Sequence, residues 1–347
     1  MVAKGQKGEL QLHASLFGIL KRDGDMTEKL IEDHYEFLTD VFLPTYKARA
    51  AEIKKKNTRM AHYCSADTAL KILSNQEFWM RDATAMNDYS ELEHGIDLIS
   101  KSKSREALKK ALNSIYEGVV DDVDNYLREA LKHIDSGTYI TCFSEHSDTE
   151  ESIGRLSMWR AYGGNAGVAL ILNNTPFIEG EGEVGLIVSP VAYLDQEDFD
   201  EKLEEVANNI RSNAKKLKQI SNRDDFSVWA MHFLMLIVLC TKHKGFAEEK
   251  EWRVISVPTM NDHKGFLKSD IHTVNGIPQK IMKIPLEDRP DLSLEGISIP
   301  KFLDKIIIGP SRHPLITWRA FREKLETIGV DESYEKVFCS DIPLRSN

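Results

Sequence analysis

The sequence predicts an α+β protein in which helices flank a central mixed β-sheet, and two observations support this class. Short β-rich runs such as TYITCFS and GVALILN alternate with longer segments whose apolar residues recur at helical spacing. Hydrophobic residues make up 41% of the 347-residue chain and charged residues 29%, the composition of a globular protein with a buried core. This length favours one domain with a large appendage over two independent cores.

Residues 1–56 are predicted to form a helical N-terminal appendage. The stretch MTEKLIEDHYEFLTDVFLP repeats apolar residues at helical spacing, and KARAAEIKKK is typical of a charged helix end. Residues 57–347 then form the core domain, with a helical insertion around 197–242. We expect this core to carry the catalytic-like chemistry, and the N-terminal helical region to be where a regulatory partner binds.

The elements of the core follow in order from residue 60. Ser65 is placed to cap a helix whose apolar residues start at Ala66, residues 91–134 are mostly helical, and a further helix covers Pro314 to Ile328. Val228 to Cys240 is the most apolar run, but it is shorter than the ~20 residues that a membrane span needs, so we interpret it as a buried helix. The predicted strands are RMAHYC, EFWMRD, TYITCFS, GVALILN, GLIVSPVAYL, EWRVISV, KIMKIPL, DKIIIGP and YEKVFCS.

Charge and cysteine usage exclude several classes of protein. Proteins bind nucleic acid through clustered lysine and arginine, and the net charge of -10 shows no excess of these residues over the whole chain. The four cysteines lie far apart without a CxxC pair, which indicates free thiols in a reducing cytoplasm and neither a disulfide framework nor a zinc site. We therefore expect a cytoplasmic protein with no membrane contact and no metal.

The stretch FAEEKEWRVI is the most conspicuous charge cluster. On a strand, Glu249 and Glu251 would share one face, because side chains alternate. Two like carboxylates on one face repel, which predicts a raised pKa for one of them and suits acid–base or cation-stabilising work. The alternative is an exposed edge strand or a surface turn.

Three other segments carry candidate site residues. In HYCSADTALKIL, His62 lies at a strand end that leads into a capped helix, where ligands often bind. In YITCFSEHSD, Ser144 and His146 are too close in sequence for a convincing nucleophile and base, and no GxSxG elbow accompanies them. Trp159 and Tyr162 are placed either to pack in the core or to stack on a planar ring.

Taken together, these segments resemble a bacterial family known as domain-of-unknown-function family 2971. The matching motifs are, in order, HYCSADTALKIL, FWMRDATAMNDYSE, CFSEHSD, MWRAYGGNAGVALIL, FAEEKEWR and IIIGP. They cover roughly residues 60 to 310. The family carries no assigned activity, so a reaction can be inferred only from the types and positions of the residues.

At a greater distance the arrangement resembles ADP-ribosyltransferases, because His62, Ser144 and Glu249-Lys250-Glu251 follow one another as the functional residues of that fold do. The resemblance implies an ADP-ribosyltransferase-like sheet and NAD as the substrate. The enzyme would be an ADP-ribosyltransferase or an NAD glycohydrolase that acts in phage defence or as a toxin-like effector, with a protein or nucleic acid as acceptor.

The resemblance also implies residue roles. Glu251 would stabilise the ribosyl cation that forms when the nicotinamide–ribose bond breaks, and Glu249 would orient the acceptor. His62 would bind the adenosine ribose and Ser144 the nicotinamide half. One aromatic residue, Tyr63, Trp159 or Tyr162, would stack on the nicotinamide ring. Arg253 would also contact the dinucleotide. On this basis Glu251→Gln should abolish turnover with little effect on thermal stability.

Two alternatives remain open. A magnesium-dependent nuclease could use Glu248-Glu249-Lys250 together with Asp148 or Asp195. In a non-catalytic sensor or binding subunit, Trp252 and Arg253 would lock the late strand to the preceding helix, with Arg253 paired to a glutamate and His62 satisfied in the core.

Overall fold

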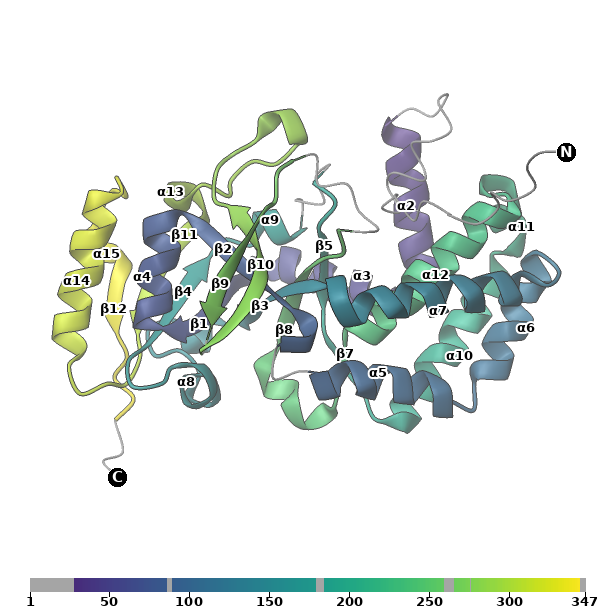
Figure 1. Cartoon of the computed structure of the whole chain (residues 1–347), viewed down its shortest axis with the longest axis horizontal. Coiled ribbons are helices and arrows are strands. Elements are labelled where there is room, and N and C mark those ends of the chain that lie inside the picture. The colour runs from purple at the N-terminus through teal and green to yellow at the C-terminus, as the bar shows by residue number, and fades with distance from the viewer. Residues whose placement is uncertain (1–27, 86–88, 179–183, 259–264, 275, 344–347) are drawn as a thin grey trace, which may run out of the picture.

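A computed structural model of the protein describes residues 28–85, 89–178, 184–258, 265–274 and 276–343 (Figure 1). It confirms the α+β class: helices flank a central mixed sheet. In Figure 1 the sheet occupies the left and centre of the molecule and a group of helices the right. The first predicted appendage residues, 1–27, lie outside the described residues.

The described part of the chain forms a ten-stranded sheet, whose main path runs β12-β11-β4-β1-β3-β2-β10-β9, with β8 and β5 branching from β3. Its pairs are antiparallel except β11 with β12. Every side chain of β4 is buried, as expected for a central strand covered on both faces. The strands are β1 (Arg59–Ser65), β2 (Glu77–Asp82), β3 (Tyr139–His146), β4 (Gly167–Leu172), β5 (Ile187–Pro190), β8 (Glu251–Ser256), β9 (Lys268–Val274), β10 (Ile277–Pro285), β11 (Leu303–Ile308) and β12 (Val337–Cys339).

The sheet forks at β3, and this fork positions the site. Strand β8 pairs with residues 139–144 of β3 along one edge. Strand β2 pairs with residues 139–140 and β1 with residues 144–146, so both must lie on the opposite edge. Residues 141–143 of that edge therefore face the gap between the diverging strands β1 and β2.

Local sequence signals account for the helices beside the sheet. The Ser65 side chain accepts a hydrogen bond from the Thr68 amide and so caps α4 (Ala66–Asn75), as predicted. A proline opens α14 (Pro314–Thr327), where its missing N–H costs nothing. The start of the predicted strand YEKVFCS is instead the short helix α15 (Ser333–Lys336), and only Val337–Cys339 pair with the sheet.

The helices on the right of Figure 1 come from three separate stretches of sequence and share one apolar core. The ring of Phe42 stacks on that of Phe233 at 4.5 Å, which ties the first described helix to the helix before β7 (Thr241–Lys242). The members are α2 (Glu28–Phe42), α5 (Tyr89–Lys101), α6 (Arg105–Ile115), α7 (Val119–Gly137), α10 (Gln196–Ser212), α11 (Ala214–Ile220) and α12 (Arg223–Leu239).

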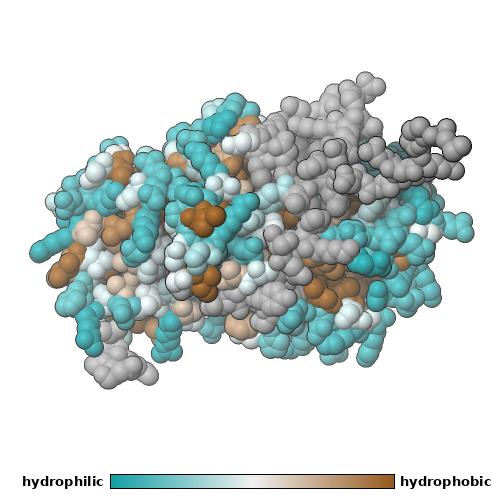
Figure 2. Space-filling model, viewed as in Figure 1, coloured by the Kyte–Doolittle hydropathy of each residue, from teal (hydrophilic) through white to brown (hydrophobic). Residues whose placement is uncertain are grey.

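Helix α12 contains most of the run Val228–Cys240 and is largely buried. Among the described residues, no helix is both long and apolar enough to cross a membrane. The four cysteines are free thiols. The face seen in Figure 2 is mostly hydrophilic, and its apolar residues lie in small separate groups.

Candidate functional site

A cleft of about 520 Å³ opens where β1 and β2 diverge along β3. Its size lies within the roughly 300–1,000 Å³ typical of small-molecule sites. The walls come from β1 and the start of α4, from β2, from residues 140–144 of β3, from α8 (Leu156–Tyr162), and from Glu249 and Glu251. Residues Thr273 and Val274 of β9 also contribute.

His62 lines this cleft at the gap between the strands. Its Nδ1 lies 3.0 Å from the carbonyl oxygen of Cys142, on the part of β3 that faces the gap. Burial lowers the pKa of the His62 imidazole, so the ring is neutral at pH 7. The carbonyl can only accept, so Nδ1 carries the proton, and Nε2 is left as an acceptor.

Glu249 and Glu251 converge on one buried lysine. The Nζ of Lys242, on β7, lies 2.6 Å from Oε2 of Glu249 and 3.2 Å from Oε2 of Glu251. The other oxygen of Glu251 accepts a 2.7 Å hydrogen bond from Nε of Arg253. The side chains of Lys242 and Arg253 are each only 2% exposed, so these are buried ion pairs.

The surroundings of Glu251 keep its carboxyl ionised. Burial acts to raise its pKa, but the charges of Arg253 and Lys242 outweigh burial and lower the pKa to about 2. The expectation of a raised pKa is therefore wrong for Glu251, because two cations offset the repulsion from Glu249.

The predicted strand EWRVISV is confirmed as β8, but Glu249 lies before it, so strand alternation does not relate the two glutamates. Lys244–Glu249 form a 3-10 helix, η3, and strand β8 begins at Glu251. Lys250 between them adopts a left-handed backbone with φ 45°, unusual for a residue with a Cβ. The two carboxylates meet because both bind Lys242 and not because of strand alternation.

Arg155 ties this segment to the rest of the cleft. One of its terminal nitrogens, Nη1, donates to Ser144 Oγ at 2.7 Å and to the carbonyls of Glu248 and Glu249 at 2.7 and 3.0 Å. Its Nε donates to Glu150 at 2.6 Å, and its side chain is 10% exposed. A planar guanidinium offers five N–H donors in a fixed fork, whereas the ammonium of a lysine offers three.

Ser144 and Tyr162 also line the cleft. The Ser144 hydroxyl is buried and donates to the carbonyl of Glu249. Tyr162, at the end of α8, is 42% exposed, and its hydroxyl lies 3.3 Å from Oε1 of Glu249. An exposed aromatic ring at a cleft wall can stack on a planar ligand.

Of the other predicted contact residues, Tyr63 lines the cleft, whereas Trp159 and Arg253 do not. Trp159 does not line the cleft: its indole donates to the carbonyl of Ile153 and packs against Gly154 and Gly309, where an added Cβ would lie within 2.5 and 2.8 Å of the ring. The ring of Tyr63 packs edge-on against Trp159, at 4.8 Å, and its hydroxyl accepts from the Arg155 amide. Arg253 is also outside the cleft, and its Nη1 donates to the carbonyl of Leu239 at the end of α12.

The residues of the nuclease alternative do not gather. Asp195 caps α10 and binds Lys244, while Asp148 and Glu248 are exposed. Within the described ranges, no group of three or more histidine, cysteine, aspartate or glutamate side chains is arranged to hold a metal ion.

Sequence reasoning missed Lys242 and Arg155. Lys242 follows a long apolar helix directly, and a lysine that close to a buried run is a sign that it is buried and paired. Arg155 lies in the polar segment SDTEESIGR, which carries no comparable signal.

Comparison with known proteins bears on the central part of the chain. Residues 158–254 match the family described as "Protein of unknown function (DUF2971)". The resemblance to this family is confirmed. The DUF2971 match runs from α8 into β8 and includes Tyr162, Lys242 and both glutamates of the cleft. No curated protein and no solved structure matches the chain.

Proposed function

We propose that the protein cleaves the nicotinamide–ribose bond of NAD, as an ADP-ribosyltransferase or an NAD glycohydrolase. One observation carries the proposal: His62, Ser144, Tyr162, Glu249 and Glu251 come from distant parts of the sequence and line a single cleft. An ADP-ribosyltransferase-like core needs these residue types in this chain order. A role in phage defence or as a toxin-like effector belongs to the same proposal.

The chemistry requires an anion next to a developing cation. When the bond between ribose C1′ and the nicotinamide nitrogen breaks, both electrons go to the nitrogen and nicotinamide leaves neutral. Positive charge then spreads over C1′ and the ring oxygen of the ribose. Glu251 suits this step because its lowered pKa keeps the carboxylate ionised over the physiological range.

The remaining residues position the substrate and the acceptor. The free Nε2 of His62 accepts a hydrogen bond from a hydroxyl of the adenosine ribose, and Ser144 lies on the nicotinamide side. Tyr162 takes the stacking role, since Trp159 lies outside the cleft and Tyr63, although it lines the cleft, is buried against Trp159. Glu249 orients the nucleophile, which is water in a glycohydrolase and a protein or nucleic-acid group in a transferase, and receives its proton.

The test is release of nicotinamide from NAD by the purified chain, with and without chelator. Release should persist in chelator, disappear in Glu251→Gln and remain in Glu248→Gln, a matched change in the same segment at an exposed side chain. Circular dichroism at the assay temperature checks that Glu251→Gln is folded. Release that chelator abolishes, or that survives in folded Glu251→Gln, contradicts the proposal.

A second candidate, a non-catalytic binding subunit, is favoured by the contacts of Arg253. This side chain joins Glu251 of β8 to the end of α12, as a purely structural ion pair would. In that case NAD is not turned over by the wild-type chain. A thermal shift with NAD but no nicotinamide release would support binding without catalysis.

A further inference from the structure

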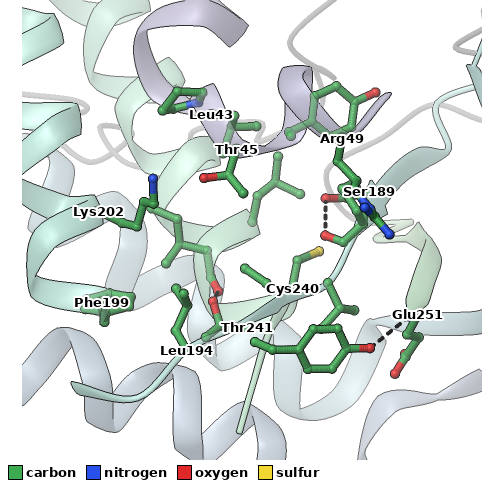
Figure 3. Close-up of a pocket in the computed structure, with 18 of the residues that line it drawn as sticks. Leu43, Thr45, Arg49, Ser189, Leu194, Phe199, Lys202, Cys240, Thr241 and Glu251 are labelled. Atoms are coloured by element: carbon green, nitrogen blue, oxygen red, sulfur yellow. Dashed lines mark hydrogen bonds between the residues drawn. The ribbon is translucent and has the colours of Figure 1, made fainter. Parts of the chain in front are cut away.

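A second cavity, of about 350 Å³, also has Glu251 in its wall (Figure 3). Four segments enclose it: the turn from α2 into α3 (Pro44–Lys56), residues 189–194 around β6 (Ala192–Tyr193), the first half of α10, and the end of α12. Glu251 lines both this cavity and the cleft. We call this second cavity the helical pocket.

The helical pocket has one apolar end and one polar end. Leu43, Leu194 and Phe199 lie on one side in Figure 3, with the exposed Lys202 beside them, while Arg49, Ser189 and Glu251 lie on the other. Of the three cationic residues at the wall, Arg49 and Lys202 are already paired, and the third, Lys250, is exposed. Arg49 binds Glu145 and lies 2.8 Å from Glu52, and Lys202 lies 2.8 Å from Glu205. Paired cations favour an uncharged ligand, because a carboxylate would have to displace an existing partner.

Tyr193 provides a hydrogen-bond donor at the polar end. Its hydroxyl accepts a 2.8 Å hydrogen bond from the amide of Glu251. No acceptor for the hydroxyl's own proton is found among the residues that the structure describes. Burial raises the pKa of Tyr193, so the proton stays on the oxygen at neutral pH. A ligand oxygen at this end would satisfy it.

From this geometry we infer that the helical pocket binds a small, uncharged and largely apolar molecule with a carbonyl or hydroxyl oxygen at one end. The volume suits this class, since an apolar cavity of roughly 150 Å³ already holds benzene and the helical pocket is more than twice as large. The apolar body lies among Leu43, Leu194 and Phe199, and the oxygen accepts from Tyr193. The inference does not depend on the reaction proposed for the cleft.

The probe is prodan, a fluorescent naphthalene that carries a ketone oxygen and no charge. Titrated into the full chain, its emission should shift to the blue and saturate at one molecule per chain. Tyr193→Phe, which removes the donor together with the acceptor of the Glu251 amide, should weaken binding about three- to tenfold. Thr45→Trp and Lys202→Trp place bulk at exposed positions on two different walls, and each should weaken binding tenfold or more.

Leu315→Trp is the matched control, because Leu315 is exposed and follows the opening proline of α14 just as Thr45 follows that of α3. It should leave the affinity unchanged, as should His62→Ala in the cleft. Binding that does not saturate, or that both wall substitutions leave intact, overturns the inference. So does loss of binding in Leu315→Trp or His62→Ala. Prodan binding and nicotinamide release are separate readouts, so either proposal can fail alone.

Discussion

Replacing Glu251 by glutamine is the most informative single change, because the sequence and the structure predict different effects on stability. Taken as an unpaired acid, Glu251 would contribute little to folding. In the structure it is 5% exposed and bound to two buried cations, Lys242 and Arg253. Removing its charge leaves Lys242 with Glu249 as a partner, and it replaces the carboxylate that Arg253 binds with a neutral acceptor.

The size of the effect follows from these contacts. Removing one partner of a buried ion pair costs about 3–5 kcal/mol, and the lower end applies here because glutamine can still accept from Arg253. Unfolding entropy of about 2.1 cal/mol/K per residue, over 347 residues, gives about 0.7 kcal/mol/K. The melting temperature of Glu251→Gln should therefore fall by about 4 °C.

Differential scanning calorimetry measures this shift directly. Glu248→Gln serves as the control, since its side chain is exposed and its melting temperature should match that of the wild type. The double variant Glu251→Gln with Lys242→Met should be less destabilised than the sum of the two single changes, because it removes one charge of each sign. A melting temperature for Glu251→Gln equal to that of Glu248→Gln would refute the buried network.

Further predictions follow from the same contacts. The stability difference between wild type and Glu251→Gln should be full above pH 4.5, the ordinary pKa of the carboxyl, and should shrink in urea titrations as the pH falls towards 2, because a lowered folded-state pKa gives stability that acid removes. Arg155→Lys should reduce nicotinamide release by about 10- to 100-fold by freeing the segment that carries Glu249, whereas Arg160→Lys, at an exposed position of α8, should not. Tyr162→Ala should raise the KM for NAD about three- to tenfold while Tyr162→Phe keeps it, and equal effects would remove the stacking role. Burial, with the nearby charge of Arg59, lowers the pKa of His146 to about 4 from 6.5, so the wild type should lose up to about 3 kcal/mol of stability between pH 6.5 and 4, and His146→Phe should flatten that slope.

Local sequence signals predicted the central strands well. The run GVALIL is apolar throughout because β4 is covered on both faces, and Ser65 marks a helix start because its side chain satisfies a free amide. Strand β9 carried no such signal. Its side chains are mostly exposed at the sheet edge, and only pairing with β10 makes it a strand.

The site was harder to predict for a physical reason. Residues of the cleft could be chosen by type and order, so His62, Ser144 and both glutamates were named from sequence. The charge state of Glu251 depends on Lys242 and Arg253, and these residues approach it only in the tertiary fold. The left-handed conformation of Lys250 likewise carries no sequence signal, because a lysine adopts it only when the surrounding contacts require it.

The position of Glu251 between two cavities has a thermodynamic consequence. Glu251 lines both cavities. A molecule in one cavity that shifts the Glu251 carboxylate therefore changes the binding free energy of a molecule in the other. Linkage makes this exchange symmetric: whatever factor a ligand of the helical pocket imposes on NAD affinity, NAD must impose on that ligand. Measuring either affinity with the other cavity filled would therefore report on both.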